Sequence, residues 1–183
     1  MKCISTILAG CFILEPRVLQ DERGYFMESF NLQAFRDLIG EDINFVQDNE
    51  SSSVRGVLRG LHYQTGKHAQ AKLVRVVQGT VLDVVVDLRK DSATYGKHLA
   101  EVLSDENKRQ LFIPRGFAHG FIVLSEKAIF SYKCDGFYEK SSEGGIKFDD
   151  PAIGIDWQLD NEQIIISAKD QELPLLKNSK PIW

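Results

Sequence analysis

The stretch 71-AKLVRVVQGTVLDVVVDL-88 contains two adjacent apolar runs that are rich in valine and leucine. Gln78-Gly79 separates them, and a two-residue turn with glycine between apolar runs is typical of a β-hairpin. Alternate side chains of a strand point to opposite faces, so Asp83 and Asp87 would share the face opposite Leu82. The stretch therefore predicts paired antiparallel strands that point two carboxylates the same way.

Similar short runs recur along the chain between turn-forming residues, among them 11-CFILEPRVL, 24-GYFMESF, 43-INFVQDN and 56-GVLRGLHYQ. Helix signals are few. The segment 31-NLQAFRDLIG has Asn31 as N-cap and Gly40 as stop, and a second short turn is expected at Ser167. Many short strands with little helix favour a sandwich or barrel over a parallel α/β sheet. We therefore predict an all-β fold, an antiparallel jelly-roll β-barrel with a few short helices and an interior that can hold a small ligand.

Length and composition limit the function classes. At 183 residues the chain can bury one substantial core, so we expect a single domain over 1–183. A net charge of -4 opposes the broad electrostatic contact that nucleic-acid binding requires. Three cysteines without CxxC spacing, and apolar runs of strand length without a signal-peptide pattern, predict a reduced cytoplasmic protein with no membrane or nucleic-acid partner.

The search for a general base starts with histidine, because its ordinary pKa lies near neutral pH. His62 follows Gly60, and glycine inside a strand often marks a bulge or the close approach of a ligand. His119 lies between a turn and an apolar strand, where it could simply fix its loop. The pattern leaves a structural or a catalytic role open for His62, and a structural role or contact with the ligand open for His119. The other two histidines, His68 and His98, lie among lysines and are expected at the surface.

Four cationic side chains sit beside glycine or in polar clusters: Arg23, Arg59, Lys72 and Lys169. Each taken singly is more often a solvated charge. Arginine is suited to bidentate contact with phosphate oxygens, and an acidic protein that binds a diphosphate must gather a few such groups in one cleft. The polar segments 21-DERG and 47-QDN could recognise a hydroxyl-rich or base-bearing ligand.

Taken in order, these segments resemble the dTDP-4-dehydrorhamnose 3,5-epimerase family along nearly the whole chain. The series that carries the resemblance is 21-DERGYFMESFN, 47-QDNESSS, 58-LRGLHYQ, 70-QAKLVRVVQG, 83-DVVVDLR, 106-ENKRQLFIPRGFAHGF, 131-SYKCDGFY, 142-SEGGI and 167-SAKDQELP. The resemblance implies a cupin-type jelly roll and a homodimer that needs no metal or cofactor. It also implies epimerisation at C3 and C5 of a dTDP-4-keto-6-deoxyhexose on the way to dTDP-L-rhamnose.

The resemblance also assigns roles by position. It implies His62 as the base, Asp170 as the carboxylate that orients it, and Tyr132 as the acid on the opposite face. Lys72 is the candidate for stabilising the enolate oxygen. The implied substrate-binding positions are Arg23, Phe26, Glu28, Gln47, Asp48, Asn49, Arg59, Lys72, His119, Tyr138, Glu143 and Lys169, with Phe26 and Tyr138 expected against the thymine or as walls of the pocket.

Strand geometry adds two expectations. Arg59 and His62 have opposite parity, so a regular strand would send them to opposite faces. Either Gly60 bends the strand, or the two residues serve different sites across a dimer interface. From their apparent inward directions, Asp83 and His119 are expected to pair.

Three rival functions stay open. A metal-dependent cupin is one, because 114-PRGFAH resembles the second cupin motif, although His62 is followed by Tyr63-Gln64-Thr65 where a metal site needs a His-x-His pair and a carboxylate. The others are a mono-epimerase acting at C3 or C5 only and a non-catalytic nucleotide-sugar-binding cupin. The sequence also leaves open whether Arg23 and Glu28 act in their own subunit's site or in a partner's.

Overall fold

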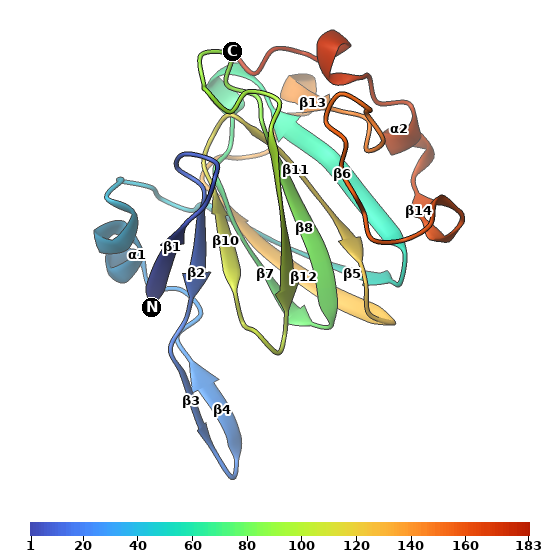
Figure 1. Ribbon diagram of the computed structural model, residues 1–183. Coiled ribbons are helices and arrows are strands. Elements are labelled where there is room, and N and C mark those ends of the chain that lie inside the picture. The colour runs from blue at the N-terminus through green and yellow to red at the C-terminus, as the bar shows by residue number, and fades with distance from the viewer.

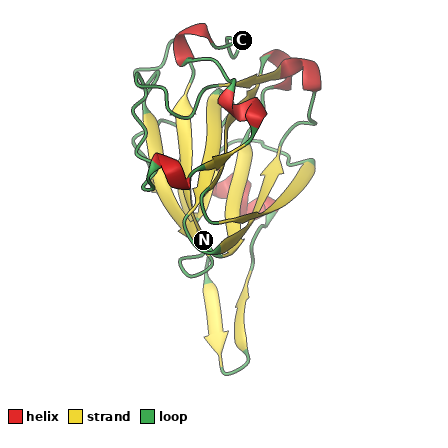
Figure 2. Ribbon diagram, turned by 90° about the vertical axis from the view of Figure 1, so that its right-hand side faces the viewer, coloured by secondary structure: helices red, strands yellow, loops and turns green.

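The computed structural model describes residues 1–183 and is built mainly from two antiparallel sheets that face each other (Figures 1 and 2). The first sheet runs β1 (Lys2–Ser5), β2 (Phe12–Glu15), β10 (Gln110–Ile113), β7 (Lys72–Gln78), β12 (Lys127–Cys134) and β5 (Gln47–Val54). The second runs β13 (Glu143–Gly145), β6 (Val57–Gln64), β11 (Phe117–Val123), β8 (Thr80–Asp87) and β9 (His98–Ser104), with β14 (Ile165–Ile166) parallel to β6. The predicted all-β class is confirmed.

The predicted hairpin between residues 71 and 88 is wrong. The strands begin and end within one residue of where the pattern placed them. However, β7 pairs with β10 and β12, whereas β8 pairs with β9 and β11. The chain therefore crosses from one sheet to the other at Gly79, which has a φ of +83°. A side chain there would overlap the carbonyl oxygen of Lys127, so the crossing requires glycine.

Three hydrophobic clusters hold the layers together. The first fills the space between the sheets and includes Val81, Val85 and Phe130. The second lies on the outer face of the second sheet, where the segment 146–182 covers it, and the third lies under helix α1 (Leu32–Ile39) on the outer face of the first sheet. Because both of its faces are covered, β8 is buried along almost its whole length.

Both predicted helical segments form. Asn31 caps α1 by accepting the backbone N–H of Ala34, and Gly40 ends the helix with a φ of +74°. Ser167 caps the short helix α2 (Ala168–Gln171). Four 3₁₀ turns complete the helical content, at Gly66–His68, Lys140–Ser142, Asn161–Gln163 and Leu176–Asn178.

The three cysteines carry no disulfide, and Cys11 and Cys134 are buried as packing residues. Burial raises the pKa of the Cys11 thiol to about 12. None of the helices has the length and apolar character needed to span a membrane.

A two-stranded hairpin, β3 (Val18–Asp21) with β4 (Gly24–Met27), projects away from both sheets (Figures 1 and 2). It carries apolar side chains that are exposed on this chain, including Leu19, Tyr25 and Phe26. Exposed apolar groups gathered on one projecting element are typical of a binding surface.

Candidate active site

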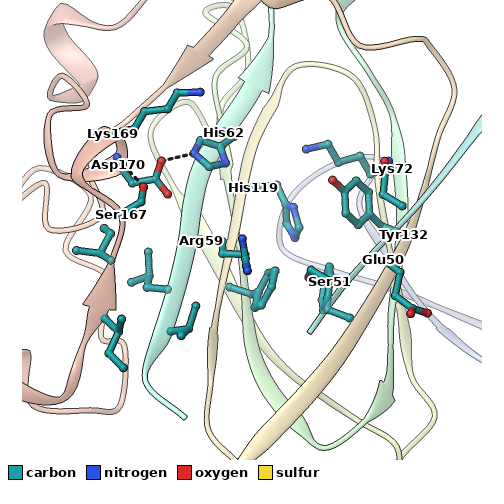
Figure 3. A pocket seen from close by; sticks show the side chains of 17 residues that line it. Glu50, Ser51, Arg59, His62, Lys72, His119, Tyr132, Ser167, Lys169 and Asp170 are labelled. Carbon is teal, nitrogen blue, oxygen red and sulfur yellow. Dashed lines mark hydrogen bonds and ion pairs between the residues drawn. The ribbon is translucent and has the colours of Figure 1, made fainter. Parts of the chain in front are cut away.

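A cavity of about 600 Å³ opens between the two sheets, and a second of about 380 Å³ adjoins it. Asn49, His62, Lys72 and Tyr132 line both, so the two form one continuous depression. Strands β5, β6, β7, β11 and β12 and the segment around α2 build its walls (Figure 3). A space of this size is in the range of small-molecule sites in proteins.

One wall carries a histidine–carboxylate pair. His62 Nε2 lies 2.8 Å from Asp170 Oδ1, and this contact leaves the other ring nitrogen, Nδ1, available to a ligand. Asp170 is held by α2, whose cap Ser167 accepts the Asp170 backbone N–H, and Asp170 Oδ2 accepts the N–H of Gly60 at 3.4 Å. Burial alone would raise the Asp170 pKa, but the hydrogen bond and charge of His62 outweigh it and lower that pKa. Asp170 therefore stays ionised beside His62.

Strand β6 carries a bulge at Gly60, which resolves the parity of Arg59 and His62. Opposite β11, His62 pairs with His119 while Arg59 pairs with Phe121, so three steps on β6 match two on β11. Both Arg59 and His62 consequently line the same cavity. Of the two explanations that strand parity left open, the structure supports the bend at Gly60.

A second histidine–carboxylate pair lies deeper between the sheets. His119 Nε2 lies 2.9 Å from Asp83 Oδ2, as the inward direction of both residues predicts. Both side chains are buried, with 7% of His119 exposed and none of Asp83. Burial lowers the pKa of His119 despite the nearby Asp83 charge, so the imidazole is neutral near neutral pH.

Tyr132 and Lys72 stand on the wall opposite His62, on β12 and β7 (Figure 3). Lys72 Nζ lies 5.8 Å from the centre of the Tyr132 ring. Burial lowers the Lys72 pKa and raises the Tyr132 pKa, which keeps the phenol protonated. The cavity thus has a possible base on one side and a proton donor on the other.

The adjoining cavity is lined by polar groups from β5 and from the segment 138–143. Gln47 Nε2 donates to Asn49 Oδ1 at 3.0 Å, and both side chains face the cavity. At its edge Glu143 Oε1 lies 2.6 Å from Lys169 Nζ, and the Tyr138 hydroxyl donates to Glu143 Oε2. The hydrogen bond from Lys169 is the main reason that the Glu143 pKa is lowered. The ion pair between Lys169 and Glu143 therefore connects helix α2 with the wall of this second cavity.

Four predicted substrate-binding residues line neither cavity within one chain. Arg23 and Phe26 lie on the projecting hairpin, where Arg23 binds Asp21 and Phe26 is 69% exposed. Glu28 follows that hairpin and accepts a hydrogen bond from Asn31. Asp48 alternates with Gln47 and Asn49 along β5, so it faces outward and pairs with Lys133 at 2.9 Å.

No group of three or more His, Cys, Asp or Glu side chains is arranged to hold a metal ion.

The sequence model of the family described as dTDP-4-dehydrorhamnose 3,5-epimerase matches residues 5–178. This chain belongs to that epimerase family. A dTDP-4-dehydrorhamnose 3,5-epimerase from Methanothermobacter thermautotrophicus is 55% identical over 179 residues, covering 97% of this chain and 96% of the relative. The sequence resemblance is thereby confirmed.

Solved structures of the epimerase family agree with this fold. The dTDP-4-dehydrorhamnose 3,5-epimerase of Elizabethkingia anophelis superposes with a TM-score of 0.94, at 56% identity and with 97% of each chain covered. The dTDP-6-deoxy-D-glucose-3,5-epimerase of Legionella pneumophila, in complex with dTDP-4-keto-L-rhamnose, gives a TM-score of 0.93 at 48% identity, covering 97% of this chain and 93% of its own.

Sequence reasoning missed several lining residues of this epimerase-family site. They are Glu50, Ser51, Val57, Leu58, Phe121, Phe130, Ile165, Ile166 and Ser167. Ser51 could have been found, because it follows Gln47 and Asn49 at a spacing of two along β5 and so shares their face. Its buried hydroxyl has no partner within the chain. The residues of β14 carried no signal, because their position depends on a long-range parallel pairing with β6.

Proposed function

We propose that this chain is a dTDP-4-dehydrorhamnose 3,5-epimerase of dTDP-L-rhamnose biosynthesis. It would epimerise C3 and C5 of dTDP-4-dehydro-6-deoxy-D-glucose to give dTDP-4-dehydro-L-rhamnose. Family membership supports the substrate class. The observation that carries the reaction is the position of the His62–Asp170 pair across the cavity from Tyr132.

His62 is the base in this proposal. The C4 ketone acidifies the hydrogens on C3 and C5, because the carbanion left by proton loss is delocalised as an enolate. Asp170 binds His62 Nε2, so Nδ1 faces the cavity. The Asp170 carboxylate also stabilises the imidazolium that forms when His62 takes up a proton. His62 would therefore take the proton from carbon while Asp170 holds the ring in place.

Tyr132 is the acid. After His62 has removed a proton from one face, inversion requires a proton from the other face. Tyr132 stands on that opposite wall, and its raised pKa keeps the phenol protonated until the enolate is there to accept the proton. The carbon–hydrogen bond that breaks and the one that forms then lie on opposite sides of the same carbon, which is epimerisation.

The enolate oxygen needs donors close by. Lys72 is the cation on the Tyr132 side of the cavity, and the buried His119 is a neutral donor or acceptor that Asp83 fixes in one orientation. Fixed groups aimed at developing charge in a site shielded from water are commonly a large part of catalysis. Lys72 would carry most of this role, because its ammonium, when protonated, is the cation on that side of the cavity.

The diphosphate and the base would lie outside the sugar subsite. Arg59 supplies a guanidinium at the cavity wall, held by a 3.1 Å hydrogen bond from its Nε to Ser53. Gln47, Asn49, Tyr138 and Glu143 offer hydrogen-bonding groups and an aromatic ring in the adjoining cavity. Guanidinium groups suit the phosphates and amide groups suit the thymine edge.

A homodimer would complete the site. Arg23 and Phe26 lie on a hairpin that stands away from the cavity of its own chain, and this hairpin therefore carries a cation and an exposed aromatic ring. These groups match a nucleotide diphosphate, and a second copy of the chain is what they could reach. Their place on the projecting hairpin thus favours action in the partner's site over action in their own.

Proton NMR of dTDP-4-keto-6-deoxy-D-glucose incubated with the protein in deuterated water tests the proposal. Deuterium at both C3 and C5, with formation of the L-configured product, is expected. Label at one carbon would make the protein a mono-epimerase, and no label at either carbon would leave a nucleotide-sugar-binding protein.

A further inference from the structure

The segment 135–139, the tyrosine loop, links β12 to the 3₁₀ turn at Lys140–Ser142 and carries Tyr138, which lines the adjoining cavity. Packing holds the aromatic rings of this loop only in part, because Phe137 is 70% exposed and Tyr138 is 53% exposed. Gly136, Phe137 and Tyr138 make no backbone-to-backbone hydrogen bond. The position of the Tyr138 ring therefore depends on side chains that reach the loop from other parts of the chain.

Two glutamines hold the tyrosine loop near its two ends. Gln64 Oε1 accepts the backbone N–H of Glu139 at 2.9 Å, and Gln70 Nε2 donates to the carbonyl oxygen of Gly136 at 2.7 Å. Both glutamines line the adjoining cavity. A glutamine amide has an acceptor at one end and a donor at the other, so it can bind either a backbone N–H or a backbone carbonyl. The wall of the cavity thus fixes the loop that carries its own aromatic ring.

Gln64 makes the more buried of these two contacts. Its side chain is only 5% exposed, and it lies two residues after His62 on β6, so both side chains face the cavity. In the pairing of β13 with β6, Gln64 lies opposite Glu143, whose carboxylate accepts the Tyr138 hydroxyl. Gln47 also accepts the N–H of Tyr138, but at the longer distance of 3.4 Å. Gln64 therefore borders both the backbone that carries Tyr138 and the residue that receives its hydroxyl.

We propose that Gln64 is a positioning residue for nucleotide binding, which holds the tyrosine loop so that the Tyr138 ring lies against the base of the bound nucleotide. This inference rests on the proposed function, in which the adjoining cavity takes the nucleotide. A ring that moves freely before binding must be ordered on binding, and that ordering lowers affinity. Gln64 acts before the ligand arrives, because its bond to Glu139 already places the loop.

Gln64→Met tests this role, because methionine has about the same length but cannot accept the Glu139 N–H. Affinity for dTDP, measured by calorimetry, should fall roughly three- to tenfold, the range expected for the loss of a single hydrogen bond. KM for dTDP-4-keto-6-deoxy-D-glucose should rise by a similar factor while kcat stays within roughly twofold, because His62 and Tyr132 are unchanged. Gln78→Met replaces an exposed glutamine of β7 outside both cavities and is the matched control, which should bind dTDP as wild type does.

A double-mutant cycle with Tyr138→Ala separates positioning from direct contact with the ligand. Because Gln64 acts through Tyr138, Gln64→Met should change the dTDP affinity of Tyr138→Ala by less than roughly twofold. A further loss as large as in the wild-type background would mean that Gln64 contacts the nucleotide itself, and this would overturn the proposal. Wild-type dTDP affinity in either single variant, or a fall in kcat at unchanged KM in Gln64→Met, would also overturn it.

A second variant covers the case in which Gln64→Met does not fold. Gln70→Met removes the other glutamine contact to the tyrosine loop, and the same loss of dTDP affinity and the same cycle with Tyr138→Ala are expected. The failure of the proposed function gives a different result. A wild-type protein that binds dTDP but places no deuterium at C3 or C5 would defeat the epimerase function, whereas the dTDP affinities of the variants would still decide the role of Gln64.

Discussion

Two histidine–aspartate pairs occupy this molecule, and their surroundings differ. His62 with Asp170 lies on the cavity wall, with 34% of the His62 side chain exposed. His119 with Asp83 is buried between the sheets, and its pKa is lowered by that burial. The same two residue types at nearly the same distance therefore serve different purposes. In the proposed mechanism, exposure to the substrate and to solvent suits His62 to act as the base, whereas burial keeps His119 a fixed neutral group.

Replacing the two aspartates one at a time should have opposite effects on activity and on stability. Asp170→Asn removes the charge that stabilises the His62 imidazolium, so kcat should fall roughly 100-fold to 10,000-fold with little change in melting temperature. Asp83→Ala leaves the N–H of the neutral His119 ring without its acceptor inside the core and should cost about 1–3 kcal/mol of stability. Steady-state kinetics and thermal unfolding of both variants check this contrast. A large loss of stability in Asp170→Asn with little loss of kcat would remove the distinction.

The proposed acid, Tyr132, should be separable by mutation from the proposed base, His62. Tyr132→Phe keeps the ring but removes the proton donor, so epimerisation should fall more than deprotonation. Deuterium exchange at C3 and C5 compared with the yield of inverted product measures the two steps. Equal loss of exchange and inversion would argue against Tyr132 as the acid.

The smallest expected effect is in the pH dependence of stability. Because the folded pKa of His119 is lowered, the unfolded chain binds a proton more readily than the folded chain as pH falls below about 6.5. The neutral His119 therefore contributes to the free energy of unfolding at pH values above its unfolded pKa, and this contribution is lost as the pH falls toward its folded pKa. His119→Gln should therefore lose less stability than wild type between about pH 7.5 and 5.5.

Urea unfolding at both pH values measures this difference. His68→Gln, at a partly exposed turn, is the control for replacing a histidine outside the core. A slope in His119→Gln equal to that of wild type would mean that His119 is not held neutral by the fold.

Local patterns predicted much of the fold. The helix at 32–39, the cap at Ser167 and the strand bounds of β7 and β8 depend on neighbouring residues and were found. The pairing of β7 with β8 was wrong because a glycine turn looks the same whether the chain folds back in one sheet or crosses to the other. The pairing between strands far apart in the sequence, such as β7 with β12, determines which of the two happens. The residues next to the turn carry no signal of that pairing.

In the site, too, the features that depend on local strand geometry were predictable and the irregular ones were not. His119 and Asp83 pair as parity predicts, because both strands are regular there. Arg59 and His62 needed the bulge at Gly60, which parity alone could not place. Asp48 follows parity too, but the resemblance placed it among the binding residues while the strand turns it outward. For Asp48, the alternation of side chains along the strand predicts the direction of the side chain in this chain, and the resemblance does not.

The measurement that tests the central claim most directly is deuterium exchange into dTDP-4-keto-6-deoxy-D-glucose by His62→Ala and His119→Ala, run beside the wild-type protein. The account predicts that His62→Ala labels neither carbon, whereas His119→Ala still labels both at reduced rates. Near-normal exchange in His62→Ala, or complete loss in His119→Ala alone, would contradict the assignment of His62 as the base.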